Sequence, residues 1–495
     1  MEKIFKLREN GTTVRTEIVA GLTTFMTMAY IIALNPNLLT NFAVGSPLWN
    51  GVFLATCIAS FIGMVVMAFV ANKPFALAPG MGLNSFFAVV VGNIAGITGL
   101  TYTASFQAAL VIILIEGIVF IVLSVLNVRE KIVEAIPLGV RLGIGPGIGI
   151  MLMNIGFGSN AGVMGGKVLG EVGDSGLVEE TIAYTSQPFY VMRDFFGALT
   201  PSKLQSDMEV WGANYSDMVL TVVTMFIGLF VIIILAQKGI KASVLIGMLV
   251  ASVIYWAGEF IFLQTNPFAG LADASAWLPP FGDMVSTTLF KFNFQGLLDI
   301  GIFTVITLVV TFCMIDMFDT IGTLVGTASR AGMLDKQGKM PQMKEALLAD
   351  AVGTVAGACT GTSTVTTFVE SASGVEAGGR TGLTALTTGI LFLACIFIRP
   401  IAAIIPPAAT SAALIYVGVL MLGGLKNIDF GDIAQMVPVA IMLISMPVSG
   451  SIGHGIGLAL ISYTVIKLFT GKARDISILT YVISAIFLIK FFLVV

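Results

Sequence analysis

Charged residues are scarce in this chain. Lys, Arg, Asp and Glu make up 11% of its 495 residues, whereas hydrophobic residues make up 57%. Soluble proteins carry about 25% charged residues, so a water-soluble globular domain is excluded as the main architecture. Apolar runs close to the roughly 20 residues that cross a bilayer recur along the whole length. We therefore expect an all-α polytopic protein of the cell (plasma) membrane, with the lipid bilayer as its surroundings.

Histidine, cysteine and positive charge are also sparse. The one histidine, His454, and the four cysteines, Cys57, Cys313, Cys359 and Cys395, show no paired metal-ligand spacing and no nucleophile beside a base. We therefore expect no enzymatic activity, no metal and no cofactor. The net charge is −3 and no basic domain is present, which argues against nucleic acid as a partner.

The chain does contain a long series of apolar runs separated by Gly, Pro and polar residues, which predicts fourteen membrane elements in two halves. The first half has elements near residues 17–38, 51–71, 82–97, 105–126, 133–157, 217–236 and 241–263, and the second near 297–328, 344–359, 364–378, 382–399, 404–424, 432–449 and 452–470. The first run is expected to remain as a membrane helix rather than to be removed as a signal. Whether a further apolar helix at 476–495 spans the membrane is left open.

The two halves echo each other. The fifth element opens with Ala135-Ile-Pro137 and the twelfth with Ile404-Ile-Pro406. Seven elements per half, an odd number, would invert the second half relative to the first, which is the arrangement that many secondary transporters use for alternating access. The sequence therefore predicts two inverted seven-element repeats.

Basic residues indicate the orientation, because cytoplasmic loops retain Lys and Arg. They precede the first span and fall in alternate connections: Lys3, Lys6, Arg8, Arg15, Arg129, Lys131, Lys238, Lys241, Arg330, Lys336, Lys339 and Lys344. This pattern predicts a cytoplasmic N-terminus and places the acidic segment 158–216 outside the cell. Arg399 does not fit the scheme.

Two short, interrupted segments occupy the third place in each half. The first, 75–87, contains Pro79, Gly80 and Gly82, and the second, 361–371, is rich in Thr and Val. Each favours an extended chain followed by a half-helix whose unpaired N–H groups point into the protein. Paired interruptions of this kind are the best sequence pointer to the midplane site of a transporter.

Polar and aromatic residues near these half-helix starts are the first candidates for a binding site. Asn84 and Glu370 offer hydrogen-bonding partners, and Phe368 offers an aromatic face. The alternatives are structural. Asn84 could bond a neighbouring helix as packing, and Glu370 could pair with Arg380. Glu116, in the fourth element, is an even choice between a buried brace and a functional acid.

Asp316 and Asp319 lie in an apolar stretch that runs from Ile300 to Ala328. A carboxylate in hydrocarbon costs several kcal/mol, so such residues usually face a polar cavity and mark a substrate or ion path. A spacing of three residues places both on one helical face. Two nearby carboxyls in a dry cavity resist joint ionisation, so one is expected to hold a proton, which suits proton coupling. Asp316 is the better candidate for bracing a neighbouring broken helix.

Four motifs carry a resemblance to a known family. They are residues 20–30 (AGLTTFMTMAY), 78–84 (APGMGLN), 316–323 (DMFDTIGT) and the segment from GTST at 361 through Glu370-Ser to EAGGRTG at 376–382. Together they resemble the AzgA-like purine permeases of the nucleobase/cation symporter group over nearly the full length. The resemblance implies a core domain (1–130 and 296–400), a gate domain (131–265 and 401–475) and short antiparallel strands in the third and tenth elements.

The resemblance also implies a function. It predicts import of purine nucleobases by proton symport, with alternating access between core and gate and a homodimer formed through the gate helices. The substrate-binding residues are then Asp319, Glu370, Asn84, Phe368, Thr27 and Thr367, and the proton-coupling residues are Asp316, Asp319 and Glu370. A carboxylate accepts two adjacent N–H donors, as on the edge of guanine, so we favour guanine and hypoxanthine, with adenine as a third candidate. The alternative is a channel or anion exchanger on a similar scaffold, which carboxylates in the site argue against.

Overall fold

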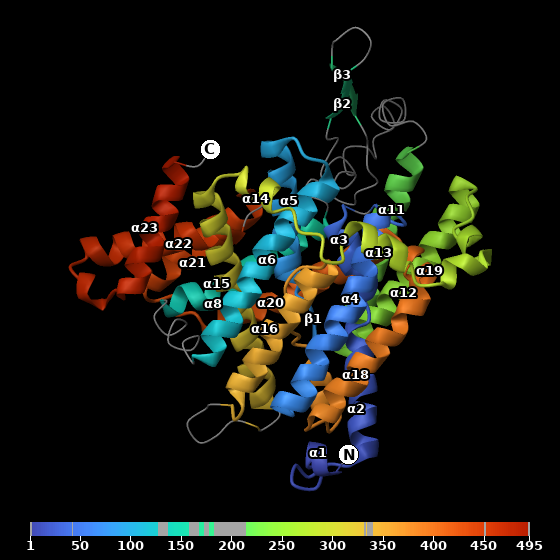
Figure 1. Cartoon of the computed structure of the whole chain (residues 1–495), viewed down its shortest axis with the longest axis horizontal. Coiled ribbons are helices and arrows are strands. Elements are labelled where there is room, and N and C mark those ends of the chain that lie inside the picture. The colour runs from blue at the N-terminus through green and yellow to red at the C-terminus, as the bar shows by residue number, and fades with distance from the viewer. Residues whose placement is uncertain are drawn as a thin grey trace.

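The chain forms an almost entirely helical membrane fold (Figure 1). A computed structural model describes residues 2–41, 43–126, 137–157, 168–172, 178–182, 214–330, 333, 340–449 and 452–493. In these ranges, 11 helices are long and apolar enough to cross a membrane. The predicted class, an all-α polytopic membrane protein, is confirmed.

The first half contains seven elements that begin and end close to the predicted runs. They follow a short helix α1 (Glu2–Phe5) and are α2 (Val14–Met28) with α3 (Ile31–Leu39), α4 (Pro47–Val66) with the π-helical turn η1 (Met67–Ala71), β1 (Leu77–Pro79) with α5 (Met81–Thr98), α6 (Tyr102–Val125), α8 (Leu138–Gly156), α11 (Asn214–Gln237), and α12 (Ser243–Gly258) with the π-helical turn η2 (Glu259–Leu263). Strands β2 (Val168–Val172) and β3 (Val178–Ile182) pair between α8 and α11. Most of the predicted external segment 158–216 lies outside the described residues.

The second half also contains seven elements. They are α15 (Ile302–Arg330), α16 (Met343–Thr360), β4 (Val365–Thr367) with α17 (Ser371–Glu376), α18 (Gly382–Ala394) with η5 (Cys395–Ile398) and α19 (Arg399–Ala403), α20 (Pro407–Met421) with η6 (Leu422–Asn427), α21 (Ile433–Ser449) and α22 (Ile452–Phe469). The halves are joined by η3 (Ala269–Ala272), η4 (Ala274–Trp277), α13 (Phe281–Thr287) and α14 (Phe294–Leu298). After α22 come η7 (Ala473–Asp475) and α23 (Ile478–Leu493).

The two interrupted segments meet as an antiparallel pair of three-residue strands. Leu77 of β1 lies opposite Thr367 of β4, and Pro79 lies opposite Val365. Both strands are fully buried. Extended backbone at membrane depth must satisfy its polar groups inside the protein, and pairing the two segments does so. The predicted strands of the third and tenth elements are therefore confirmed.

Equivalent elements of the two halves also meet at α8 and α20, the fifth and twelfth. Each helix begins after a proline, Pro137 or Pro406. The two cross so closely that a Cβ at Gly149 would lie 2.5 Å from the carbonyl oxygen of Gly418, and the reverse contact is the same. Small residues permit such backbone approach between membrane helices. The two inverted repeats thus touch through matching elements.

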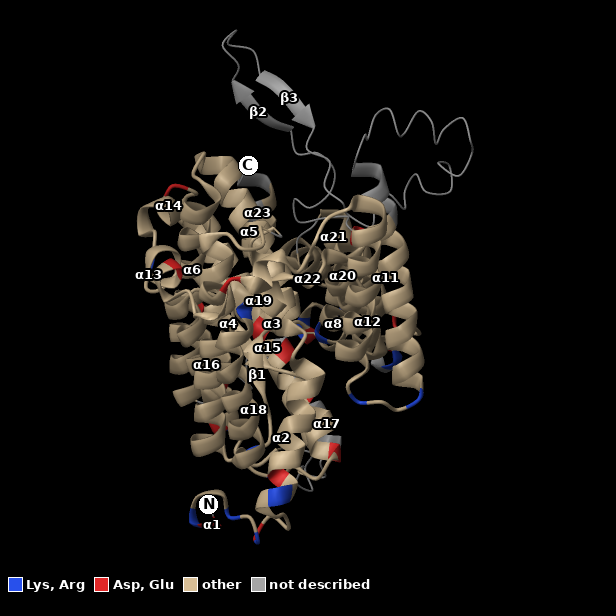
Figure 2. Ribbon diagram, turned by 90° about the vertical axis from the view of Figure 1, so that its right-hand side faces the viewer, with Lys and Arg blue, Asp and Glu red and all other residues tan. Residues whose placement is uncertain are grey.

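The helices pack in two groups (Figure 2). The first group comprises α2 to α6 and α13 to α19 with both strands β1 and β4, and the second comprises α8, α11, α12, α20, α21 and α22. The most extensive packing is within a group, as between α6 and α16 or between α8 and α20, whereas α5 and α8 are among the few elements that touch across the boundary. The division places a boundary beside the β1–β4 pair.

Two features left unexplained by the sequence have structural partners. Arg399 donates hydrogen bonds to the carbonyl of Ala276 and to Asn50, so this arginine is held by the connection between the halves. Helix α23 packs against α22 and α15. Its 16 residues rise about 24 Å, which falls short of the hydrocarbon thickness of about 30 Å.

Candidate functional site

A cavity of about 590 Å³ lies at the boundary between the two helix groups. The first group contributes parts of α2, the start of α5, α15 and the segment from β4 through α17, and the second contributes the α11–α12 turn and α20. The volume is in the range of about 300–1,000 Å³ typical of small-molecule sites. A solute bound here would touch both groups.

Three acidic residues line this cavity, Asp319, Glu370 and Glu376, and the first two were singled out in the sequence. Asp319 comes from α15 and Glu370 from the turn between β4 and α17, and both are half-buried. A Cβ at Gly80 would lie 3.8 Å from Asp319 Oδ2, so the carboxyl of Asp319 reaches the start of α5. The Glu370 carboxyl accepts a hydrogen bond of 2.8 Å from the hydroxyl of Tyr30. The structure therefore brings together two of the acids that the sequence singled out.

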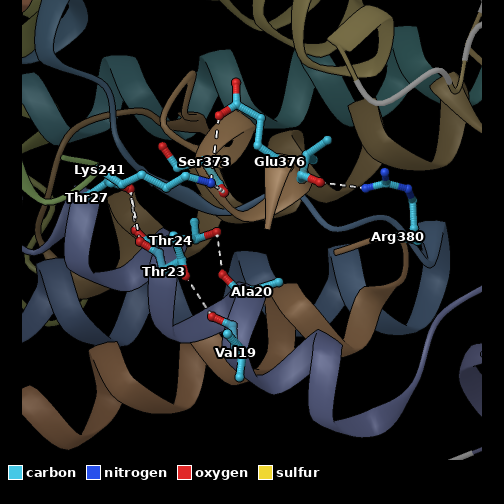
Figure 3. A network of polar contacts seen from close by, with 10 residues as sticks. Val19, Ala20, Thr23, Thr24, Thr27, Lys241, Ser373, Glu376 and Arg380 are labelled. Atoms are coloured by element: carbon cyan, nitrogen blue, oxygen red, sulfur yellow. Dashed lines mark hydrogen bonds and ion pairs between the residues drawn. The ribbon is translucent and has the colours of Figure 1, made fainter. Parts of the chain in front are cut away.

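Phe368, Thr27 and Thr367 also line the cavity. The Thr27 hydroxyl donates to the carbonyl of Thr24 at 2.8 Å (Figure 3), which leaves its oxygen as an acceptor. The Thr367 side chain is 2% exposed, and its hydroxyl has no hydrogen-bond partner among the described residues. A buried polar atom without a partner is costly, and a polar solute in the cavity would supply one.

Asn84 is placed elsewhere. It is fully buried and is not among the described residues that line the cavity. Its Nδ2 donates to Asn35 Oδ1 at 2.6 Å and to the carbonyl of Pro79 at 3.2 Å, and its Oδ1 accepts from Ser363 Oγ. This placement agrees with the alternative given for Asn84 in the sequence analysis, a packing hydrogen bond to a neighbouring element.

Asp316 also lies behind the cavity rather than on its wall. Its carboxyl is fully buried and accepts from Thr320 Oγ1 at 3.0 Å. The same hydroxyl lies 3.0 Å and 3.1 Å from the carboxyl oxygens of Asp350 on α16, and Asp350 accepts from the backbone N–H of Thr367 at 3.1 Å. Asp316 therefore belongs to a polar layer that supports β4, as expected for a bracing residue.

Comparison with known proteins identifies the family. A model of the Permease family (Xan_ur_permease) matches residues 15–184 and 202–458. This chain belongs to that permease family. Adenine permease AdeP of Escherichia coli is 36% identical over 490 residues, covering 99% of this chain and 95% of the relative. Guanine/hypoxanthine permease PbuO of Bacillus subtilis is 35% identical over 493 residues, covering 99% and 100%. The resemblance found in the motifs is confirmed.

The fold of this permease also occurs in more distant transporters. The transmembrane domain of a cyanobacterial bicarbonate transporter, BicA, superposes with a TM-score of 0.60, over 89% of this chain and 96% of that chain, at 14% sequence identity. At this identity the likeness concerns the fold alone. The family assignment and the 11 candidate spans of the described residues together make this chain a multi-pass membrane permease.

Hydrogen bonds show the partners of two further residues that the sequence left open, Glu116 and Arg380. Glu116 on α6 accepts from Thr364 Oγ1 at 2.7 Å, so it braces the chain just before β4. The guanidinium of Arg380 donates to the carbonyls of Val375 and Gly379, at 2.6 Å and 2.7 Å. Glu370 bonds to Tyr30 instead, and a pair between Glu370 and Arg380 is not among the described contacts.

Three residues of the permease site were missed from the sequence. Asp350 is a buried acid within α16, and the argument applied to Asp316 would have found it. Tyr30 ends one of the family motifs but carries no charge or break that marks it. Lys241 was used only for orientation, yet it lines the cavity, and its Nζ lies 3.1 Å from the carbonyl of Ser373 and 3.8 Å from Glu376 Oε2 (Figure 3). Their partners are too distant in the sequence for spacing to reveal them.

Proposed function

We propose that this permease imports purine nucleobases into the cytoplasm by proton symport. Guanine and hypoxanthine are the favoured substrates, and adenine is the third candidate. The relatives AdeP and PbuO, named as adenine and guanine/hypoxanthine permeases, support the substrate class. Their identities to this chain, 36% and 35%, are too similar to choose between the bases.

The observation that carries the proposal is the chemistry of one cavity. It is lined by the carboxyls of Asp319 and Glu370, the ring of Phe368 and the unpartnered hydroxyl of Thr367. A purine is flat and carries N–H donors and ring acceptors on its edge. Carboxylates accept such donors strongly, a hydroxyl both donates and accepts, and an aromatic face stacks on a flat ring. These groups match a purine in kind.

Alternating access follows from the position of the cavity. We assign the first helix group to the core domain (1–130 and 296–400) and the second to the gate domain (131–265 and 401–475). Because the cavity is lined from both groups, a movement of one group against the other would open it to one side of the membrane and close it to the other. By resemblance to the family, we extend the proposal to a homodimer through the gate helices.

The orientation is proposed from the basic residues that the structure describes. The N-terminal segment and the α11–α12 turn, which both carry lysines, lie toward the same end of the molecule (Figure 2). Retention of Lys and Arg on the inside then makes this end cytoplasmic. Arg129, Lys131, Lys336 and Lys339 lie outside the described residues.

Proton coupling is proposed from Asp319 and Glu370, two of the acids that line the cavity. Two carboxylates in one partly buried site repel each other, and a proton bound at the site removes part of that cost. The proton and the neutral base would then cross together. Asp316 remains in the proposal as a member of the layer behind the cavity rather than as a ligand.

The test is uptake of radiolabelled guanine into proteoliposomes that contain the purified permease and an inward proton gradient. We expect saturable uptake that unlabelled hypoxanthine competes, that a protonophore abolishes and that replacement of sodium leaves unchanged. A matched set of liposomes without the protein gives the background. Sodium-dependent uptake would contradict the coupling, and failure of every purine to bind or to be transported would contradict the substrate class.

An anion exchanger is the alternative on a similar scaffold, and BicA shows that the fold is also used by a bicarbonate transporter. The cavity argues against it here, because an anion would face the carboxyls of Asp319 and Glu370. Lys241, which also lines the cavity, is already within 3.8 Å of Glu376. Uptake of bicarbonate without any competition by purines would favour the alternative.

A further inference from the structure

Tyr30 lies at the junction of α2 and α3 and points its hydroxyl at the candidate site. The residue is 1% exposed, and it lines the cavity. The turn at residues 29 and 30 separates the two helices, so the ring leaves the chain where the helix axis is broken. The hydroxyl reaches Glu370 Oε1 at 2.8 Å, from a position 340 residues earlier in the sequence.

Glu370 itself lies in a turn rather than within a helix or a strand. It occupies the two-residue turn between β4 and α17, next to Val369, which is 51% exposed. A free glutamate side chain has several rotamers to choose among. The hydrogen bond from Tyr30 is a side-chain contact that restricts this choice, beside a bond from the backbone N–H of Glu370 itself. The bond from Tyr30 engages Oε1 and keeps the carboxyl turned toward the cavity.

We propose that Tyr30 is a positioning residue that holds Glu370 in its substrate-binding rotamer and occupies one acceptor position of its Oε1, so that Tyr30 helps to set which purine is preferred. The inference rests on the proposed function. Each carboxylate oxygen has two acceptor positions, so the bond from Tyr30 leaves Oε1 the weaker acceptor of the two, and Oε2 the stronger one for the single N1–H donor of hypoxanthine. Guanine presents N1–H and the 2-amino group side by side, and its second donor must share Oε1 with the Tyr30 hydroxyl.

Removal of the hydroxyl therefore has two consequences. The loosened carboxyl binds every purine more weakly, and the freed Oε1 offers guanine a second acceptor that hypoxanthine cannot use. We expect Tyr30→Phe to raise the KM for hypoxanthine about tenfold, because the freed Glu370 side chain must then be ordered when the base binds. The KM for guanine should rise less, and the maximal rate should stay within about twofold for both bases.

Tyr102 gives a matched control. It is a half-buried tyrosine whose hydroxyl also donates a bond of 2.8 Å, but to the carbonyl of Leu39 and away from the cavity lining. Tyr102→Phe should leave both KM values within about twofold of the wild type, because it removes a comparable hydrogen bond without reaching Glu370. If Tyr30→Phe and Tyr102→Phe changed the KM for hypoxanthine by the same factor, and the KM for guanine by the same factor, the inference would be overturned.

A double-mutant cycle separates positioning from folding. In Glu370→Asp the shorter side chain withdraws the carboxyl from Tyr30, so adding Tyr30→Phe should change binding by less than about twofold, since the coupling is already lost. Binding is read as the ligand-induced thermal shift with hypoxanthine and with guanine. Two outcomes would overturn the inference even if the wild type binds purines. One is full additivity of the effects of the two substitutions on binding, and the other is an unchanged ratio of guanine to hypoxanthine affinity in Tyr30→Phe. If the wild type binds no purine, the proposed function fails and the inference falls with it.

Discussion

The two interrupted segments occupy equivalent places in the two repeats, but they serve the cavity differently. The first runs from β1 into α5, which has 18 residues, and the second runs from β4 into α17, which has 6. The first presents backbone at Gly80 and Gly82 to the cavity and turns Asn84 inward. The second presents the side chains of Thr367, Phe368 and Glu370.

The available space explains the difference. A Cβ at Gly80 would lie 2.5 Å from Thr366 Cγ2, and one at Gly82 would lie 2.6 Å from Ile148 Cγ2 of α8. The start of α5 is thus packed between β4 and the second helix group, without room for a side chain at Gly80 or Gly82. The short α17 leaves room beside it. The two copies of an inverted repeat can therefore differ in role. Here the first contributes tightly packed backbone to the cavity, and the second contributes the polar and aromatic side chains.

The largest expected effect is loss of an acid from the second segment or from α15. Glu370→Gln and Asp319→Asn should each raise the KM for guanine about 10- to 100-fold, because each removes a charged acceptor of the base. Asp273→Asn is the control, since the Asp273 carboxylate accepts hydrogen bonds from Ser275 in the connection between the halves and is not among the described residues that line the cavity. Uptake kinetics in proteoliposomes measure the effect. Unchanged guanine uptake in both site variants would remove the cavity from the mechanism.

The next effect tests the crowding of the first segment. Gly80→Ala places a methyl group against Thr366 and should reduce transport about tenfold by displacing β4, since overpacking typically costs about 1–3 kcal/mol. Gly92→Ala lies on the same helix α5, where a Cβ meets nothing within 4 Å, and should leave transport unchanged. Expression level and initial uptake rate are measured for both. Equal behaviour of the two variants would show that the segment is not tightly packed.

Asn84→Ala should affect stability rather than recognition. The substitution leaves Asn35 and Ser363 without their buried partner, which costs about 1–3 kcal/mol of unfolding free energy. We expect a lower unfolding temperature in detergent and a guanine KM within about twofold of the wild type. A large rise in KM without loss of stability would instead make Asn84 a ligand and the two segments alike.

The smallest effect is expected at the contact between the α11–α12 turn and α17. The side chains of Lys241 and Glu376 are 38% and 52% exposed, and exposed ion pairs contribute about 0–1 kcal/mol. Lys241→Gln should change the uptake rate by at most about threefold, and the difference should shrink at high salt. The control is Lys467→Gln, which removes an ion pair of the same 3.8 Å length with Asp475, at η7. A tenfold loss of transport in Lys241→Gln would make this contact an essential link between the groups.

Much of this architecture was readable from residue patterns. Apolar length and the placement of Gly and Pro predicted the helices, the two halves and the two extended segments, since an isolated span must satisfy its own backbone in lipid. The family resemblance, and not the pattern, implied that these segments pair as strands. Acids next to breaks in those runs predicted Asp319 and Glu370 as cavity residues. The same signal also selected Asn84 and Asp316, which the structure places in packing contacts. A polar residue in an apolar segment needs a hydrogen-bond partner, but the sequence pattern does not show which residue that partner is.

The sequence by itself determined that this protein lies in a bilayer, where its membrane elements run and where they are interrupted, because those properties depend on local hydrophobicity and backbone chemistry. Only the tertiary structure decided which buried polar groups share the cavity. Tyr30 meets Glu370 across 340 residues, and Lys241 meets Ser373 across 132. Such meetings depend on how the helices cross, which is set by the packing of all the elements together.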